Sequence, residues 1–276
     1  MSIFAQPKID CHCHVIDPVR FPFKPGTPYR PTGQEVAPLE NFLRIMNLYG
    51  VRHALVVGTN SCYAEDLGPV LDAVARGEGR FKGVAVVTND ISAANLARLK
   101  ASGMVGVAFN APFKGTAHYA QTGDLLQKLT GLDMFLQIQV KEDQLLELLP
   151  LIERSHVRLV VDHCGRPAPK RGLDQPGFQA LLELGRAGRA TAKLSGFNQF
   201  SGERYPYPDV HPFIGALLDA FTPEGCVWGS DWPFLRAVER IDYGPLLSLA
   251  ETILTDETNR TKVLWDTPRR LFGFSS

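Results

Sequence analysis

The sequence of 276 residues lacks net charge, long hydrophobic runs and any pronounced basic cluster. Its 29 Lys and Arg residues balance 29 Asp and Glu residues, which argues against nucleic acid as the main partner. No apolar segment approaches the length needed to span a membrane, and none follows a basic start as in a signal peptide. These absences predict a soluble cytoplasmic protein without a nucleic-acid or membrane partner.

Cysteine is scarce and shows no recognisable spacing. The five cysteines are odd in number and match neither a disulfide framework nor a zinc ribbon, so we expect reduced thiols, as in cytosolic proteins. The sequence also lacks a G-x-G-x-x-G or P-loop pattern after an early strand. That absence removes the usual basis for predicting a nucleotide-binding fold.

Short apolar, β-branched runs recur along the chain, separated by segments with the apolar spacing of helices. This alternation predicts parallel βαβ units, and near-continuous apolar runs suit strands that are buried on both faces. The number of runs and the chain length favour an α/β fold of the (β/α)8 TIM-barrel type, as one domain over residues 1–276, rather than an open doubly wound sheet. The predicted strands cover residues 9–15, 54–57, 84–87, 105–109, 135–140, 157–161, 192–194 and 226–228.

Two stretches contain too much proline or glycine to form helices. Residues 20–38 include five prolines, and residues 196–212 include the run Tyr-Pro-Tyr-Pro. They follow the first and seventh predicted strands. In a barrel, loops that follow strands emerge at the carboxyl-terminal face, where they build the active site.

The first predicted strand ends in the motif Asp10-Cys11-His12-Cys13-His14. Alternate side chains of a strand share a face, so we expect His12 and His14 to lie on one face with Asp10. Cys11 and Cys13 would then pack outward against the helices. Two imidazoles at a strand end can bind a metal or polarise a carbonyl group, which predicts an active-site edge.

Two later strands also end in ionisable side chains. The sixth is followed by Val-Asp-His-Cys-Gly-Arg-Pro over residues 161–167, and the eighth by Trp-Gly-Ser-Asp-Trp-Pro over residues 228–233. Asp162 is out of phase with the histidine beside it, so we expect it to fix the loop rather than contact a substrate. Strands one and eight are neighbours in a barrel. We therefore expect four side chains to converge at the mouth: His12, His14, His163 and Asp231.

Together, and in this order, the three motifs resemble the amidohydrolase superfamily, and more narrowly its 2-pyrone-4,6-dicarboxylate hydrolase-like lactonases. The resemblance covers essentially the whole chain and implies a hydrolase that opens a small carboxylated lactone. It implies that Asp231 is the general base that takes a proton from water. His12, His14 and His163 would polarise the lactone carbonyl and stabilise the oxyanion. Arg166 would bind a substrate carboxylate with its planar guanidinium.

The sequence departs from the metal-dependent members of that superfamily, which usually have a histidine at the end of strand five and often a lysine at strand four. Here the fifth strand reads Phe-Leu-Gln-Ile-Gln-Val over residues 135–140, and the fourth ends at Asn110. A glutamine amide is a poor zinc ligand. We therefore expect no two-metal site and favour a site without a metal cofactor. The alternative is a single zinc ion held by His12, His14 and Asp231.

The sequence also offers few cations to hold a dicarboxylate. The resemblance leads us to expect an arginine near Ala108, and none is present. We therefore expect a substrate with fewer carboxylates, for example one, and more hydroxyl groups, so a sugar-acid lactone or a muconolactone fits better than the pyrone dicarboxylate. The predicted substrate-binding residues are Arg166, Lys114, Asn110, Gln137, Gln139 and Asn198.

Other functions of the same scaffold stay open. A lactone isomerase would use the same polarised carbonyl, and a zinc-dependent decarboxylase of aromatic acids would normally need the missing histidine of strand five. A barrel that only binds a ligand is disfavoured because all four polar residues of the mouth are present. The sequence specifies neither the lactone nor the oligomeric state, and it is compatible with a homo-oligomer.

Overall fold

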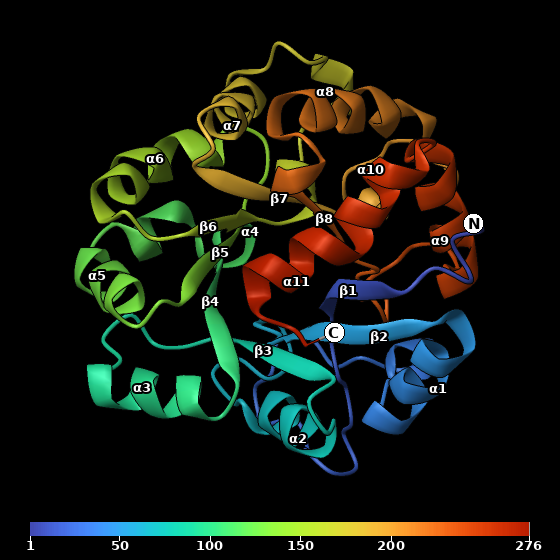
Figure 1. The fold of residues 1–276 in the computed structure, drawn as a ribbon. Helices are drawn as coiled ribbons and strands as arrows, with labels where there is room; N and C mark the ends of the chain where they lie inside the picture. The colour runs from blue at the N-terminus through green and yellow to red at the C-terminus, as the bar shows by residue number, and fades with distance from the viewer. Residues whose placement is uncertain (276) are drawn as a thin grey trace.

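Eight parallel strands form a barrel in the computed structural model, which describes residues 1–275 (Figure 1). The strands pair in sequence order from β1 to β8, and a bridge between Cys13 and Trp232 joins the end of β1 to the segment after β8. This single-domain arrangement confirms the predicted TIM barrel, and each predicted strand overlaps an observed one. The strands are β1 (Lys8–Cys13), β2 (Val51–Val57), β3 (Phe81–Ala85), β4 (Met104–Asn110), β5 (Phe135–Gln139), β6 (Leu159–Val161), β7 (Ala190–Leu194) and β8 (Cys226–Trp228).

Helices surround the strands in Figure 1, and none of those in residues 1–275 is long and apolar enough to cross a membrane. The α-helices are α1 (Leu39–Tyr49), α2 (Gly68–Arg76), α3 (Ala93–Ala101), α4 (Ala111–Lys114), α5 (Gly123–Gly131), α6 (Gln144–Ser155), α7 (Pro176–Arg186), α8 (His211–Phe221), α9 (Tyr243–Ile253), α10 (Glu257–Thr261) and α11 (Thr267–Phe272). Short 3₁₀ turns are η1 (Gly33–Glu35), η2 (Thr116–Tyr119), η3 (His163–Gly165), η4 (Pro169–Arg171), η5 (Phe197–Gln199), η6 (Pro208–Val210) and η7 (Pro223–Gly225), and η8 (Lys262–Asp266) is a π-helix.

The interior of the barrel is filled with apolar side chains toward the amino-terminal end of the strands. Residues from six strands meet there with two phenylalanines from the C-terminal end of the chain, and the rings of Phe135 and Phe272 lie 5.1 Å apart. Helix α11 crosses this end of the barrel (Figure 1). The polar side chains of the barrel interior therefore lie at the opposite, carboxyl-terminal end of the strands. The interior cluster consists of Ile9, Cys11, Leu55, Val57, Val84, Phe135, Val160, Val227, Phe272 and Phe274.

A bulge interrupts β1 within the histidine motif. Asp10 is the partner of Ala54 on β2, whereas Cys13 is the partner of Val56, so three steps along β1 match two along β2. An extra residue of this kind bends the strand and changes which side chains share a face. Strict alternation, on which the sequence-based prediction depended, therefore does not hold across the motif.

The bulge corrects two expectations about the motif. Asp10 does not face the mouth; its carboxylate lies on the helix side, where it accepts hydrogen bonds from the Tyr243 hydroxyl of α9 and the Ser230 backbone N–H, both at 2.9 Å. Cys11 does not face the helices, because it packs among the interior residues of the barrel. Cys13 packs in the layer between strands and helices, as predicted.

The two proline- and glycine-rich loops are largely irregular, as predicted. Within residues 20–38 the only regular element is the short turn η1, and residues 196–212 contain η5, η6 and the first two residues of α8. A bridge between Ile16 and Ala37 closes the base of the first loop. This loop brings Tyr29 and Glu35 toward the segment that follows β8, where both contact Arg236.

Candidate active site

A cavity of about 380 Å³ opens at the carboxyl-terminal end of the strands, lined mostly by polar groups. Both the strand ends and the loops after β6, β7 and β8 contribute to its wall. Eight of the ten predicted site residues line it: His12, His14, Asn110, Gln137, Gln139, His163, Arg166 and Asp231.

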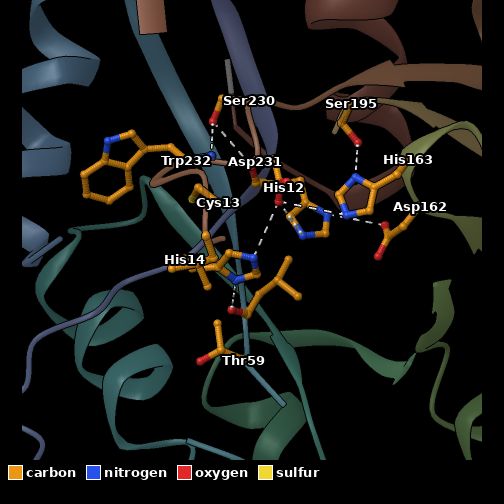
Figure 2. A network of polar contacts seen from close by, with 12 residues as sticks. His12, Cys13, His14, Thr59, Asp162, His163, Ser195, Ser230, Asp231 and Trp232 are labelled. Atoms are coloured by element: carbon orange, nitrogen blue, oxygen red, sulfur yellow. Dashed lines mark hydrogen bonds and ion pairs between the residues drawn. The ribbon is translucent and has the colours of Figure 1, made fainter. Parts of the chain in front are cut away.

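Asp231 lies at the centre of three imidazole rings in this cavity (Figure 2). Its Oδ1 atom lies 3.7 Å from Nε2 of His12, 3.7 Å from Nε2 of His14 and 3.9 Å from Nε2 of His163. The His12 ring centroid lies 5.0 Å from that of His14 and 4.6 Å from that of His163. The structure therefore brings together the four residues that the three motifs predicted to converge.

Close contact between β1 and the segment after β8 holds this arrangement. The Asp231 N–H donates to the His12 carbonyl and the His14 N–H to the Trp232 carbonyl, both at 2.8 Å. Gly229 allows the approach, because a Cβ there would lie 2.7 Å from Cβ and 2.8 Å from N of His12. Asp231 itself has a φ of 61°, a left-handed conformation that costs energy in non-glycine residues and concentrates at functional sites.

The electrostatic environment keeps Asp231 ionised. Burial alone would raise the pKa of its carboxyl, but the facing imidazoles of His163 and His12 outweigh burial, so this pKa lies well below its ordinary value. Burial lowers the pKa of His163 to about 4 and also lowers the pKa of His12. Both rings are therefore neutral near pH 7. A neutral imidazole has one nitrogen that donates a hydrogen bond and one that accepts.

The tautomer of a neutral His14 follows from its backbone contact. Nδ1 of His14 lies 2.8 Å from the carbonyl oxygen of Val57. A carbonyl can only accept, so Nδ1 carries the proton and, in the neutral ring, Nε2 carries the lone pair. In this form His14 can accept a proton from water or bind a metal ion, and it cannot donate a hydrogen bond to a carbonyl.

A left-handed turn positions His163 directly after β6. Residues 163–166 all have φ between 46° and 74°, which costs roughly 1–2 kcal/mol for each non-glycine residue because Cβ approaches a carbonyl oxygen. Because of this turn, both Asp162 and His163 line the cavity although they are adjacent in sequence. That Asp162 holds the structure rather than contacts a substrate stays a prediction. Nδ1 of His163 lies 2.9 Å from Ser195 Oγ. Gly196 leaves room for this ring, since a Cβ there would lie 2.4 Å from Nδ1.

A polar network below the histidines contains Lys193, which the sequence analysis did not single out. Its Nζ donates to Gln137 Oε1 at 2.6 Å and lies 3.1 Å from Asp162 Oδ1 and 3.3 Å from His12 Nδ1. Gln137 Nε2 donates to Asp162 Oδ2 at 2.7 Å. Both ends of the Gln137 amide are thus engaged within the protein. The signal in the sequence was a lysine inside a short apolar strand, because a buried lysine needs partners.

Two predicted substrate contacts lie outside the cavity wall. The Lys114 side chain is directed to Glu65, with 3.7 Å between the charged atoms. Asn198 does not line the cavity, but its neighbour Gln199 does, and Nε2 of Gln199 lies 3.3 Å from Asp231 Oδ2. The turn η5 gives the two residues different directions, and loop conformation of this kind cannot be derived from strand alternation.

The cavity carries more positive charge than the sequence analysis anticipated. Arg166 lines it, and its buried Nε has no hydrogen-bond partner among the described residues. Lys141 and Arg236 also line it, and the Arg236 guanidinium lies 4.4 Å from the centre of the Tyr29 ring. Three cationic side chains therefore line the cavity. Its two acidic side chains are already paired, because Asp231 faces histidines and Asp162 faces Lys193.

The donor set is also suited to a metal ion. Ligand atoms of His12, His14 and Asp231 lie within 4.8 Å of one another, and the same is true of His12, Asp162 and His163. Imidazole nitrogen and carboxylate oxygen are ordinary zinc ligands, and three of them with a water form a catalytic zinc site. By ligand type and spacing alone, these residues match a site for one zinc ion.

A (β/α)8 barrel with histidines after strands one and six and an aspartate after strand eight defines the amidohydrolase class of enzymes. The family model described as amidohydrolase matches residues 9–274, and the chain belongs to this family. The resemblance drawn from the three motifs is thereby confirmed.

Several curated proteins are similar to the chain over almost its whole length. It is 33% identical to a 4-sulfomuconolactone hydrolase of Rhizobium radiobacter, over 98% of this chain and 92% of that protein. It is 29% identical to a 2-pyrone-4,6-dicarboxylate hydrolase of Comamonas testosteroni, over 96% and 89%. It is 28% identical to a D-galactarolactone isomerase of Agrobacterium fabrum, over 99% and 93%.

A solved structure from Pseudomonas putida has the same fold. It carries a provisional 2-pyrone-4,6-dicarboxylic acid hydrolase name, is 27% identical to this chain, covers 98% of both chains and superimposes with a TM-score of 0.87.

Proposed function

We propose that the protein hydrolyses a small anionic lactone, with Asp231 as the general base. The observation that carries this proposal is the placement of three imidazole Nε2 atoms within 3.9 Å of one carboxylate oxygen, in a cavity ringed by cations. The lactone hydrolases among the relatives support the same reaction class.

In the proposed reaction, the Asp231 carboxylate takes a proton from water while the water oxygen attacks the lactone carbonyl carbon. The carbonyl electron pair moves to its oxygen, and the resulting oxyanion is stabilised by N–H groups of His12 and His163. The tetrahedral intermediate then collapses, the ring C–O bond breaks, and the proton on Asp231 passes to the leaving oxygen. His14, whose Nε2 accepts rather than donates, orients the attacking water.

We propose a lactone with two anionic groups, which revises the expectation of a single carboxylate. Arg166 has a free buried Nε for one anion, and Lys141 and Arg236 lie in the same wall for a second. Two of the similar proteins are named for lactones with two acidic groups. Asn110 and Gln139 are left to contact neutral oxygens, although Asn110 Oδ1 also accepts a hydrogen bond from the Phe113 N–H at 3.2 Å.

We propose that this reaction proceeds without a metal. If a zinc ion were bound by His12, His14 and Asp231, it would supply Lewis-acid polarisation and a more acidic water. The buried Lys193 ammonium beside His12 argues against that assignment, because it lies 3.3 Å from His12 Nδ1. We further propose a cytoplasmic location for this single catalytic domain of residues 1–276, in keeping with five cysteines that are all free thiols. Homo-oligomer formation stays a prediction.

The function is tested by following proton release with a panel of lactones that carry zero, one or two anionic groups. We expect hydrolysis, seen as one proton released per ring opened, to be fastest with two anionic groups. Isomerisation would consume the lactone without releasing acid, and a decarboxylase would instead release carbon dioxide from an aromatic acid. Either of these outcomes would refute hydrolysis.

The substitution Arg236→Met tests whether Arg236 binds the second anionic group of the lactone. We expect kcat/KM to fall by about 10- to 100-fold for lactones with two anionic groups, the loss of one charge-assisted contact, and to change little for lactones with one. The matched control is Arg240→Met, because Arg240 is exposed and, within residues 1–275, pairs with Asp242 in the same loop. An equal loss for both substrate classes would contradict the assignment.

A further inference from the structure

Lys193 is fully buried on β7 and is absent from the cavity wall, so it does not touch a substrate. Its ammonium group forms a closed ring of contacts with Gln137 and Asp162. The ammonium donates to the Gln137 amide oxygen, and the Gln137 amide nitrogen donates to Asp162. The Asp162 carboxylate in turn forms an ion pair with the ammonium. Outside this ring, its remaining polar contact with the residues that the structure describes is Nδ1 of His12, at 3.3 Å.

This contact determines where a neutral His12 carries its proton. An ammonium group can only donate, so the Nδ1 atom that faces it must accept, and the proton is then on Nε2. The competing partner is Asp162 Oδ1, which lies 3.4 Å from the same Nδ1 and would favour the opposite tautomer. That oxygen lies closer to Lys193 Nζ, at 3.1 Å, than to Nδ1 of His12, so the ammonium offsets the negative charge that would draw a proton to Nδ1.

We propose that Lys193 is a positioning residue that fixes His12 as the Nε2–H tautomer. The two histidines of the β1 motif are then set to opposite roles by two fixed partners. The Val57 carbonyl makes Nε2 of His14 an acceptor, and the Lys193 ammonium makes Nε2 of His12 a donor directed into the cavity. The value of this donor for catalysis rests on the proposed function, whereas the tautomer itself does not.

The same arrangement makes His12 a poor metal ligand. Zinc would need the lone pair of Nε2, so the proton would have to move to Nδ1, where it would face an ammonium group. Without that positive charge, Asp162 would be free to accept a hydrogen bond from Nδ1–H. Carboxylate, histidine and metal would then form the arrangement that usually supports metal-binding histidines.

The test is ¹⁵N NMR of histidine-labelled protein, with the His12 signals assigned by their loss in His12→Asn. In the wild-type protein we expect Nε2 of His12 to show the shift of a protonated ring nitrogen and Nδ1 that of an unprotonated one, and the reverse for His14. A wild-type His12 with the proton on Nδ1 would overturn the proposal, and this measurement needs no lysine variant to fold.

Two variants disturb the same buried pair with different expected results. In Lys193→Met, we expect the His12 proton to move to Nδ1 and zinc affinity, measured by calorimetric titration with zinc chloride, to rise by about 10- to 100-fold. In the matched control Asp162→Asn, the ammonium is retained, so the tautomer should be unchanged and zinc affinity should not rise. Equal changes in both variants would show a merely structural role and overturn the proposal. Absence of lactone hydrolysis alongside the expected tautomers would instead refute only the proposed function.

Discussion

At the scale of single residues, the site depends on how each ring and carboxylate is held. Asp231 stays ionised although it is buried, because the imidazoles of His163 and His12 face one of its oxygens. His163 is kept neutral by burial and is fixed at Nδ1 by Ser195. A base and its neutral partners can therefore coexist near pH 7 within one small cavity.

The depressed pKa of His163 makes folding stability depend on pH. Its folded pKa is about 4, against an ordinary value of 6.5, so between these values the unfolded chain binds the proton more readily. We expect the free energy of unfolding to fall by up to about 3 kcal/mol as the pH drops through this window. Urea unfolding at pH 7 and pH 5 measures the effect.

The substitution His163→Gln should flatten this pH dependence, and His118→Gln serves as the control because His118 lies on the surface. An undiminished slope in His163→Gln would assign the dependence to other groups.

At the scale of elements, the site residues lie where the strands depart from regular β geometry. The bulge in β1 turns His12 into the cavity, and the left-handed turn after β6 does the same for two adjacent residues, Asp162 and His163. The junction between β1 and the segment after β8 needs Gly229, because a side chain there would collide with the His12 backbone.

The substitution Gly229→Ala should therefore destabilise the protein by about 1–3 kcal/mol, a usual cost of overpacking, and reduce turnover by displacing Asp231 from His12. Gly131→Ala is the matched control, since a Cβ at that position on α5 meets nothing within 4 Å. Thermal unfolding of both variants measures the difference. Equal stability of the two would show that the close approach at Gly229 is not required.

These departures explain how far the sequence could predict the site. The histidines and Asp231 were predictable because they follow strands that are adjacent or face each other in a barrel. Cys11 and Asp10 were assigned to the wrong faces because a bulge cannot be recognised from apolar alternation. Arg236 was missed because its place in the wall depends on a loop that contacts Tyr29.

At the scale of the whole molecule, the barrel is divided into an apolar base and a polar mouth. The order of strands, their parallel pairing and the single domain followed from the alternation of apolar runs, which is a property of the whole chain. Lys193 lies between the apolar base and the polar mouth. It is a fully buried strand residue whose ammonium contacts polar partners, including His12. Its role depended on distances between three strands, which one sequence does not contain.

The central claim is that Asp231 activates the water that opens the lactone. It is tested most directly by the kinetics of Asp231→Asn with the best lactone of the panel, with Asp124→Asn, on the surface helix α5, as the control. The asparagine amide has the same shape but cannot take a proton. The account predicts that kcat falls by about 10²- to 10⁴-fold in Asp231→Asn while KM changes little. A kcat within a few-fold of the wild-type value would contradict it.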